Sequence, residues 1–102
     1  MSSPMSTLRD LAQQDVDDAT TALGKSRQAY LHAEQQLSML LNYQDEYRQK
    51  LNQGMSGGMD ASRWQNYQQF IRTLDQAIDQ HRVQLNQCNV RLATATRCWQ
   101  EK

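Results

Sequence analysis

The chain has 102 residues and a mass of 11.8 kDa, which is enough for one small domain. Lysine plus arginine and aspartate plus glutamate each number 11, so the formal net charge is zero, and no basic run offers the clustered cations that nucleic-acid binding needs. Hydrophobic residues make up 38% of the chain and the mean hydropathy is -0.87, which leaves too few apolar side chains for a round globule with a thick core. Sixteen glutamines, four glycines and one proline favour long helices with a narrow apolar seam, and they argue against an enzyme with a walled pocket.

The sequence points to a reducing, cytoplasmic environment. Its first residues contain no apolar segment of the signal-peptide type, and the longest aliphatic run, 39–41, is far shorter than a membrane span of about 20 residues. Cys88 and Cys98 are about 15 Å apart on one predicted helix, which is too far for a disulfide. Together with His32 and His81 they fall on different turns, so we expect free thiols, no metal site and no cofactor.

A glycine-rich stretch divides the sequence into two arms. Residues 53–60 contain three of the four glycines, and glycine's access to positive φ ends helices and forms turns. Nothing within about 5–52 or about 61–102 stops a helix, although Gly24 lowers helix propensity by about 1 kcal/mol relative to alanine. We therefore predict one helical arm on each side of a turn at about 53–60, within a single domain spanning 1–102.

Local signals mark where the helices begin. Ser3 followed by Pro4 is typical of an N-cap with proline at the first helical position, and Asp60 or Ser62 can accept the free N–H groups of a second helix. The last residues, 97–102, include no glycine or proline that closes the second helix. We therefore expect a longer C-terminal extension in the complete protein.

Both arms carry a heptad pattern, in which seam residues recur mainly at alternating steps of three and four. In the first arm the seam is Ala12, Val16, Ala19, Leu23, Ser26, Tyr30, Ala33, Leu37, Leu40, Gln44, Tyr47 and Leu51, and in the second it is Trp64, Tyr67, Ile71, Leu74, Ile78, His81, Leu85, Cys88, Leu92, Ala95 and Trp99. This spacing keeps one stripe of each helix facing a partner helix. The predicted fold is therefore all-α, a long antiparallel two-helix coiled-coil hairpin. Its seam contains polar and small residues, so we expect modest stability and fraying ends.

Aromatic residues flank this seam on one edge. In an antiparallel pair whose turn is centred at about residue 55, the heptad g positions of the two arms lie side by side. These positions include Gln36, Tyr43, Phe70 and Ala77, and they adjoin the seam residues Leu40, Tyr47, Leu74 and His81. A two-helix pair has no third layer to cover the rings, so Tyr43 and Phe70 are candidate anchors for a protein partner. Alternatively, both rings fold over the seam and only widen it.

One histidine and a group of acidic residues each have two interpretations. At a seam position His81 either fills the seam with its polar edge at the rim, or it helps to bind a partner or responds to pH. No base or nucleophile accompanies it at a spacing typical of catalysis, so we expect no enzyme. The acidic residues of the first arm either form a solvated face that Arg91 and Arg97 balance from the second arm or meet a basic partner. They are Asp10, Asp15, Asp17 and Asp18.

Several strings are more specific than the heptads that all coiled coils share. They are Leu8-Arg9-Asp10-Leu11-Ala12, Val16-Asp17-Asp18-Ala19, Ala33-Glu34-Gln35-Gln36-Leu37, Tyr43-Gln44-Asp45-Glu46-Tyr47, Arg63-Trp64-Gln65-Asn66-Tyr67-Gln68-Gln69-Phe70-Ile71 and His81-Arg82-Val83-Gln84-Leu85. Over nearly the whole chain these strings resemble the flagellar type III export protein FliJ family. Members of that family are usually longer at the C-terminus.

The resemblance implies a non-enzymatic part of flagellar protein export, built as an antiparallel coiled coil similar to the central stalk of rotary ATPases. It implies a cytoplasmic protein, peripherally associated with the inner membrane at the flagellar base. The implied partners are the export ATPase FliI hexamer, the cytoplasmic domain of the export gate protein FlhA and flagellar export chaperones, with no nucleic acid and no direct membrane insertion. The implied gate-binding residues are Gln36, Leu40, Tyr43, Tyr47, Phe70, Leu74, Ala77 and His81, and the implied ATPase-ring contact lies near Leu8, Leu11, Asp15, Arg91 and Arg97.

Two other functions stay open on the sequence alone. One is a generic dimerising or scaffold coiled coil, in which the exposed aromatic rings belong to a self-interface. The other is a chaperone for exported flagellar subunits. The mass in solution distinguishes a scaffold coiled coil from a coupling protein. Binding assays against the gate, the ATPase and export substrates distinguish a chaperone from a coupling protein.

Overall fold

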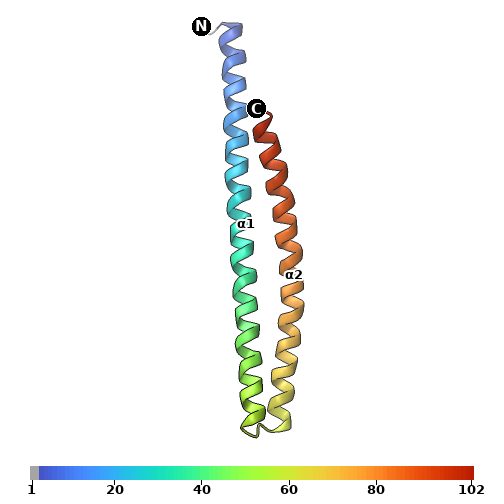
Figure 1. Ribbon diagram of the computed structural model, residues 1–102. Coiled ribbons are helices and arrows are strands. Elements are labelled where there is room, and N and C mark those ends of the chain that lie inside the picture. The colour runs from blue at the N-terminus through green and yellow to red at the C-terminus, as the bar shows by residue number, and fades with distance from the viewer. Residues whose placement is uncertain (1–2) are drawn as a thin grey trace. The chain divides into compact units, whose positions relative to one another are not determined.

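The computed structural model describes residues 3–102, apart from the side chains of residues 55 and 56. Within this range α1 spans Pro4–Ser56 and α2 spans Ala61–Gln100, and the two run in opposite directions (Figure 1). The predicted all-α antiparallel pairing of two long helices is confirmed. The chain divides into two units: unit 1 comprises Met1–His32 with Asn86–Lys102, and unit 2 comprises Ala33–Leu85.

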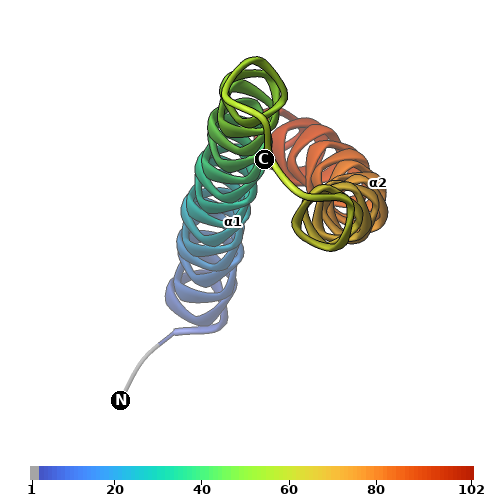
Figure 2. The ribbon, with the colours of Figure 1, turned by 90° about the horizontal axis from the view of Figure 1, so that it is seen from below.

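Unit 2 contains the turn and the buried part of the seam. Figure 2 shows the connection passing directly from the end of α1 to the start of α2. The buried apolar residues of the described chain all lie in this unit: Ala33, Leu51, Ile71, Leu74 and Ile78. Each of them is a predicted seam residue, which confirms the heptad frame in this part of both helices.

The end of α1 is a Schellman motif, a C-terminal cap closed by a residue in the left-handed region. Gly58 has a φ of 81°, which glycine adopts at little cost. This conformation lets the Met59 N–H donate to the Gly54 carbonyl at 2.8 Å, and the Met59 side chain lies directly against Gly54. Helix α1 therefore continues to Ser56 rather than ending at about residue 52 as the sequence predicted, because Gly54 remains helical and supplies a capping carbonyl.

Helix α2 begins with a side-chain cap. The Asp60 carboxylate accepts the Arg63 N–H at 2.8 Å, so Asp60 and not Ser62 is the N-cap. At the other helix start, the Ser3 hydroxyl accepts the Ser6 N–H at 3.1 Å and Pro4 opens α1, as predicted. Both helix starts thus follow from capping chemistry that is visible in the sequence.

Unit 1 has a thinner seam. None of its described residues is buried, and those that are half-buried include Val16, Ala19, Leu23, Ser26, Tyr30, Cys88, Leu92 and Ala95. All of these are predicted seam residues, but many are small. Neither α1 nor α2 contains, in the residues that the structure describes, a stretch long and apolar enough to cross a membrane.

The seam prediction fails at three terminal positions. Ala12, Trp64 and Trp99 are exposed rather than packed in the seam. In unit 1, α2 ends at Gln100, and Figure 1 shows the first turns of α1 extending beyond that end, where α2 does not cover them. Trp64 and Trp99 lie in the first and last turns of α2, at the two ends of the predicted seam of that helix.

Candidate functional site

An aromatic cluster of Tyr47, Tyr67 and Phe70 lies in unit 2, close to the turn. The Tyr47 ring centroid is 4.5 Å from that of Phe70 and 6.0 Å from that of Tyr67, with interplanar angles of 49° and 50°. These tilted geometries are favourable for aromatic pairs. Phe70 nevertheless remains 42% exposed, so the cluster keeps an apolar surface available for contact.

The cluster forms one wall of an open hollow of about 270 Å³. Its lining consists of Tyr47, Tyr67 and Phe70 together with Arg63 and Asn66. Of these residues, Tyr47 and Phe70 were predicted from the sequence as site residues, whereas Tyr67, Arg63 and Asn66 were not. Arg63 precedes Phe70 by one heptad and therefore shares its g position, which is the signal that could have found it.

Tyr43 occupies a different place from Phe70. It lines a separate, smaller hollow of about 140 Å³ on α1, together with Met39, Asn42 and Glu46. Tyr43 as a whole is 52% exposed, so its side chain is not sealed over the seam. The alternative that both rings fold over the seam therefore applies in part to Phe70, which lies against the seam residue Tyr47, and not to Tyr43.

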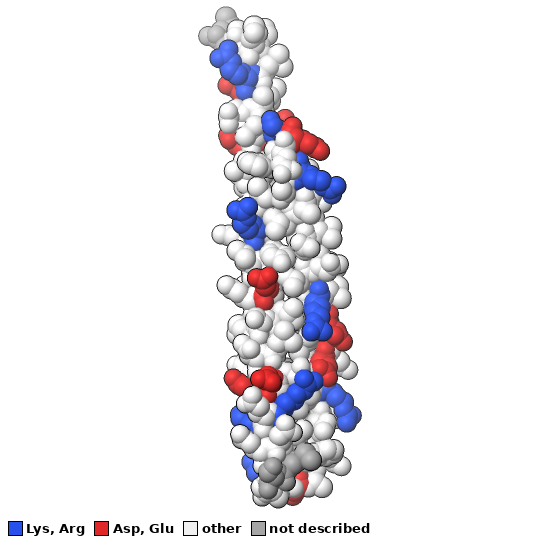
Figure 3. Space-filling view, viewed as in Figure 1, with Lys and Arg blue, Asp and Glu red and all other residues white. Residues whose placement is uncertain are grey.

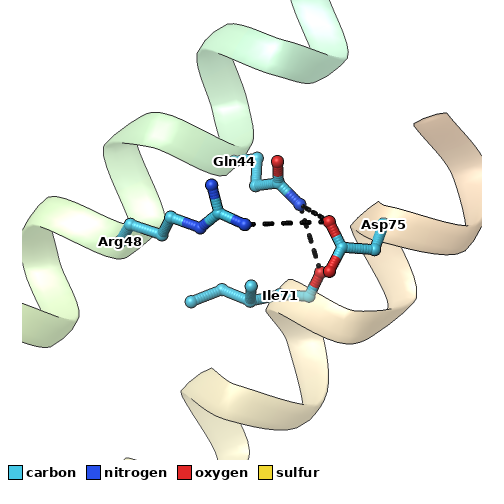
Figure 4. Close-up of polar contacts among 4 residues, drawn as sticks. All are labelled: Gln44, Arg48, Ile71 and Asp75. Atoms are coloured by element: carbon cyan, nitrogen blue, oxygen red, sulfur yellow. Dashed lines mark hydrogen bonds and ion pairs between the residues drawn. The ribbon is translucent and has the colours of Figure 1, made fainter.

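A polar network connects α1 and α2 within unit 2. Gln44 is 5% exposed, and its amide donates to the Asp75 carboxylate and to the Ile71 carbonyl, the latter at 3.5 Å. Arg48 lies 3.8 Å from the same carboxylate (Figure 4). A buried polar residue in a coiled-coil seam favours the one register in which it finds its partners. We refer to Gln44, Arg48 and Asp75 as the polar network.

The eight implied gate-binding residues all belong to unit 2, but they differ in accessibility. Gln36, Tyr43 and Phe70 are exposed, and Leu40, Tyr47, Ala77 and His81 are half-buried. Leu74 is only 8% exposed and packs in the core, so it is not available as a surface residue. The His81 Nδ1 atom is buried and has no hydrogen-bond partner within the described part of the chain.

The five residues implied in ATPase-ring contact all belong to unit 1 and are all exposed: Leu8, Leu11, Asp15, Arg91 and Arg97. Leu8 and Leu11 are unusually open for leucines, at 66% and 60%. The neighbouring carboxylates of Asp17 and Asp18 accept hydrogen bonds from Gln13 and Gln14 at 3.0 and 2.8 Å. Such pairing one turn apart fits the interpretation of a solvated acidic face.

The remaining chemistry-bearing side chains do not converge. Cys88 is half-buried, Cys98 is exposed, and both are free thiols. No group of three or more histidine, cysteine, aspartate or glutamate residues within the described 3–102 range is placed to hold a metal ion. On the face drawn in Figure 3, basic and acidic side chains alternate, and neither sign gathers into a broad patch.

Comparisons with known proteins all identify the same family. The model of the flagellar FliJ protein family matches residues 1–102. The chain is 51% identical over 98 residues to the flagellar FliJ protein of Escherichia coli (strain K12) and 50% identical over 98 residues to that of Salmonella typhi, in each case covering 96% of this chain and 67% of the relative. It is also 37% identical over 54 residues to the flagellar FliJ protein of Buchnera aphidicola subsp. Acyrthosiphon pisum (strain APS), covering 50% of this chain and 37% of the relative.

Proposed function

Because the chain belongs to the flagellar FliJ family, and is thus a non-enzymatic component of flagellar protein export, we propose that it couples the export ATPase ring to the export gate. In this proposal one region of the coiled coil engages the FliI hexamer, and another presents aromatic rings to the cytoplasmic domain of FlhA. The protein also escorts flagellar export chaperones. It acts in the cytoplasm, peripherally associated with the inner membrane at the flagellar base.

The observation that carries the gate contact is the exposed aromatic surface of unit 2. Tyr43 and Phe70 are 52% and 42% exposed although each adjoins apolar neighbours, and a two-helix pair gives no further layer to cover them. Aromatic residues in this position are the usual anchors of protein interfaces, since they bury a large area at a low entropic cost. Leu74, which the resemblance also implies in gate binding, is only 8% exposed and belongs to the buried seam of the same unit.

The proposed contact with the export ATPase ring is supported by different residues. Leu8 and Leu11 expose most of their surface in unit 1, with Asp15 one turn beyond Leu11 on the same helix. Exposed leucines at helical spacing suit a groove in a partner protein. Arg91 and Arg97 are exposed in the same unit and offer cations to such a partner. This segment can favour one nucleotide state of the ATPase ring over another only if its contacts with the ring differ between those states.

Binding assays with purified partners test both contacts. Phe70→Ala and Tyr43→Ala should each weaken binding to the FlhA cytoplasmic domain about tenfold or more, because interface aromatics commonly contribute at least ~1–2 kcal/mol. Trp99→Ala is the matched control, since Trp99 is 44% exposed but lies in unit 1. Equal losses for Phe70→Ala and Trp99→Ala, or no binding of the unaltered chain to FlhA, contradict the gate contact.

The ATPase contact is tested in the same way. Leu11→Ser should weaken binding to the FliI hexamer, whereas Val83→Ser, at a residue that is 58% exposed in unit 2, should not.

Sedimentation of the free chain tests the alternative of a scaffold coiled coil, because it measures whether the chain forms an oligomer. If Tyr43→Ala with Phe70→Ala dissociates an oligomer and leaves FlhA binding intact, the protein is a scaffold coiled coil rather than a coupling component.

A further inference from the structure

The side chains of two cationic residues beside the aromatic cluster form no ion pair in the described part of the chain, although the Arg63 backbone N–H donates to Asp60. The Lys50 Nζ lies 5.1 Å from the Tyr47 ring centroid, and Arg63 lines the hollow that Tyr47, Tyr67 and Phe70 enclose. Among the residues that the structure describes, neither side chain has an aspartate or glutamate oxygen within 4.0 Å. Arg48, by contrast, reaches Asp75 at 3.8 Å.

The heptad positions explain this difference. Arg48 and Asp75 are e positions of their helices and have opposite charges, so the e edge is balanced within the chain. Lys50 and Arg63 are g positions, and the g edges of an antiparallel pair adjoin one another. Two cationic side chains without an ion-pair partner on this edge favour the binding of an anionic group from outside the chain.

We propose that this hollow is a docking pocket for an acidic protein segment that carries a bulky apolar side chain. The apolar side chain enters between the Tyr47, Tyr67 and Phe70 rings, and carboxylates beside it pair with Lys50 and Arg63. The inference deepens the proposed function, on which it rests for the identity of the partner, by stating the chemistry that the gate must offer. A volume of about 270 Å³ exceeds the ~150 Å³ of a cavity that holds benzene, so a leucine or phenylalanine side chain fits.

A nucleic acid is the less suitable anion. The chain has zero formal net charge, and affinity for phosphates requires several clustered cations. The lining also contains only one cationic side chain beside three aromatic rings and an amide, a composition that suits a mixed apolar and acidic peptide.

The test uses the full chain with both g-edge cations reversed, Lys50→Glu with Arg63→Glu, and measures the affinity for the FlhA cytoplasmic domain at low and high salt. We expect at least a tenfold loss at low salt and a weaker salt dependence than that of the unaltered chain. Arg72→Glu is the matched control, because Arg72 is exposed in the same unit at a heptad position away from the seam. It should change the affinity less than twofold, and circular dichroism should show that both variants remain folded.

The outcomes separate this inference from the proposed function. If FlhA binding depends on Tyr43 and Phe70 but Lys50→Glu with Arg63→Glu behaves like Arg72→Glu, the gate contact stands and the acidic docking pocket is wrong. If FlhA does not bind at all, the proposed function fails, and a synthetic peptide with glutamates on both sides of a leucine tests the pocket alone by NMR.

That peptide should shift the Tyr47, Tyr67, Phe70 and Arg63 signals, and the shifts should vanish in the charge-reversed variant. A peptide with lysines in place of the glutamates should leave these signals unchanged. Equal shifts from the lysine peptide, or from a single-stranded oligonucleotide, overturn the proposal, because the pocket would then not select an acidic protein segment.

Discussion

Units 1 and 2 share one heptad pattern but differ in how much of it they bury. Unit 2 contains every buried residue of the described chain, including Ile71, Leu74 and Ile78, whereas no described residue of unit 1 falls in that class. Both units follow the same three-and-four spacing. In unit 1, seam residues such as Leu23 and Leu92 are half-buried, which shows that the pattern still identifies the inward face there. The spacing thus decides which face of each helix turns inward, and side-chain size decides how well that face is sealed.

The two contacts proposed above fall in different units. Unit 2 combines a packed seam, a capped turn and a polar network, and it holds the aromatic surface proposed for the gate. Unit 1 combines a thin seam with the exposed leucines proposed for the ATPase ring. A binding surface that rests on a rigid core keeps its shape before the partner arrives, whereas a loosely packed segment can adapt when it binds. The proposals therefore assign a preformed contact to unit 2 and an adaptable contact to unit 1.

The largest expected effect comes from truncating a core residue of unit 2. Ile78 is 3% exposed, and Ile78→Ala should lower the free energy of unfolding by about 2–5 kcal/mol because it leaves a cavity that the two helices cannot fully close. Leu92→Ala, at a half-buried seam residue of unit 1, should cost about 1 kcal/mol. Urea unfolding followed by circular dichroism measures both. Equal losses would mean that the two units are packed equally well.

The next effect concerns polar seam residues. Gln44→Ala should destabilise the chain by about 1–2 kcal/mol, since it removes two hydrogen bonds from a buried amide, and Ser26→Ala in unit 1 should be nearly neutral. Gln44→Leu should keep or raise the stability while allowing more than one helix register, which NMR detects as additional peak sets. A more stable Gln44→Leu protein with a single peak set would show that packing alone fixes the register.

Much of the fold could be predicted from the sequence, because it depends on local chemistry. The seam followed from the three-and-four spacing, and the caps at Ser3 and Asp60 followed from side chains that accept helix N–H groups. The end of α1 was placed too early, since three glycines compete for the left-handed position and only the three-dimensional turn shows that Gly58 takes it. That shift moves the centre of the turn toward the C-terminus, and it changes which residues face each other.

The candidate site was less predictable because it depends on pairing between helices. Phe70 was identified from its heptad position beside Tyr47, but the separate hollow in which Tyr43 lies depends on the true register. The sequence marked Gln44 only as a weak, polar member of the seam. Its burial becomes favourable through Asp75, which no pattern within one helix reveals.

A smaller effect is expected from the helix caps. Asp60→Ala should cost about 1 kcal/mol, because it removes the acceptor for the Arg63 N–H where α2 starts beside the packed seam of unit 2. Ser3→Ala removes a comparable hydrogen bond in unit 1, but there it should only fray the first turn and leave the midpoint of thermal unfolding unchanged. A matching loss in both variants would show that the start of unit 1 is as firmly packed as the turn.

The smallest expected effect concerns the ion pair. Arg48 and Asp75 side chains are 54% and 53% exposed, so water and salt screen their attraction, and a double-mutant cycle with Arg48→Ala and Asp75→Ala should give a coupling of at most about 0.5 kcal/mol. Arg97→Ala in unit 1 is the control, because Arg97 has no carboxylate within ion-pair distance in the described chain. A coupling well above 1 kcal/mol that survives in high salt would require the pair to act together with the buried amide of Gln44. Electrostatics as well as side-chain size would then distinguish unit 2 from unit 1.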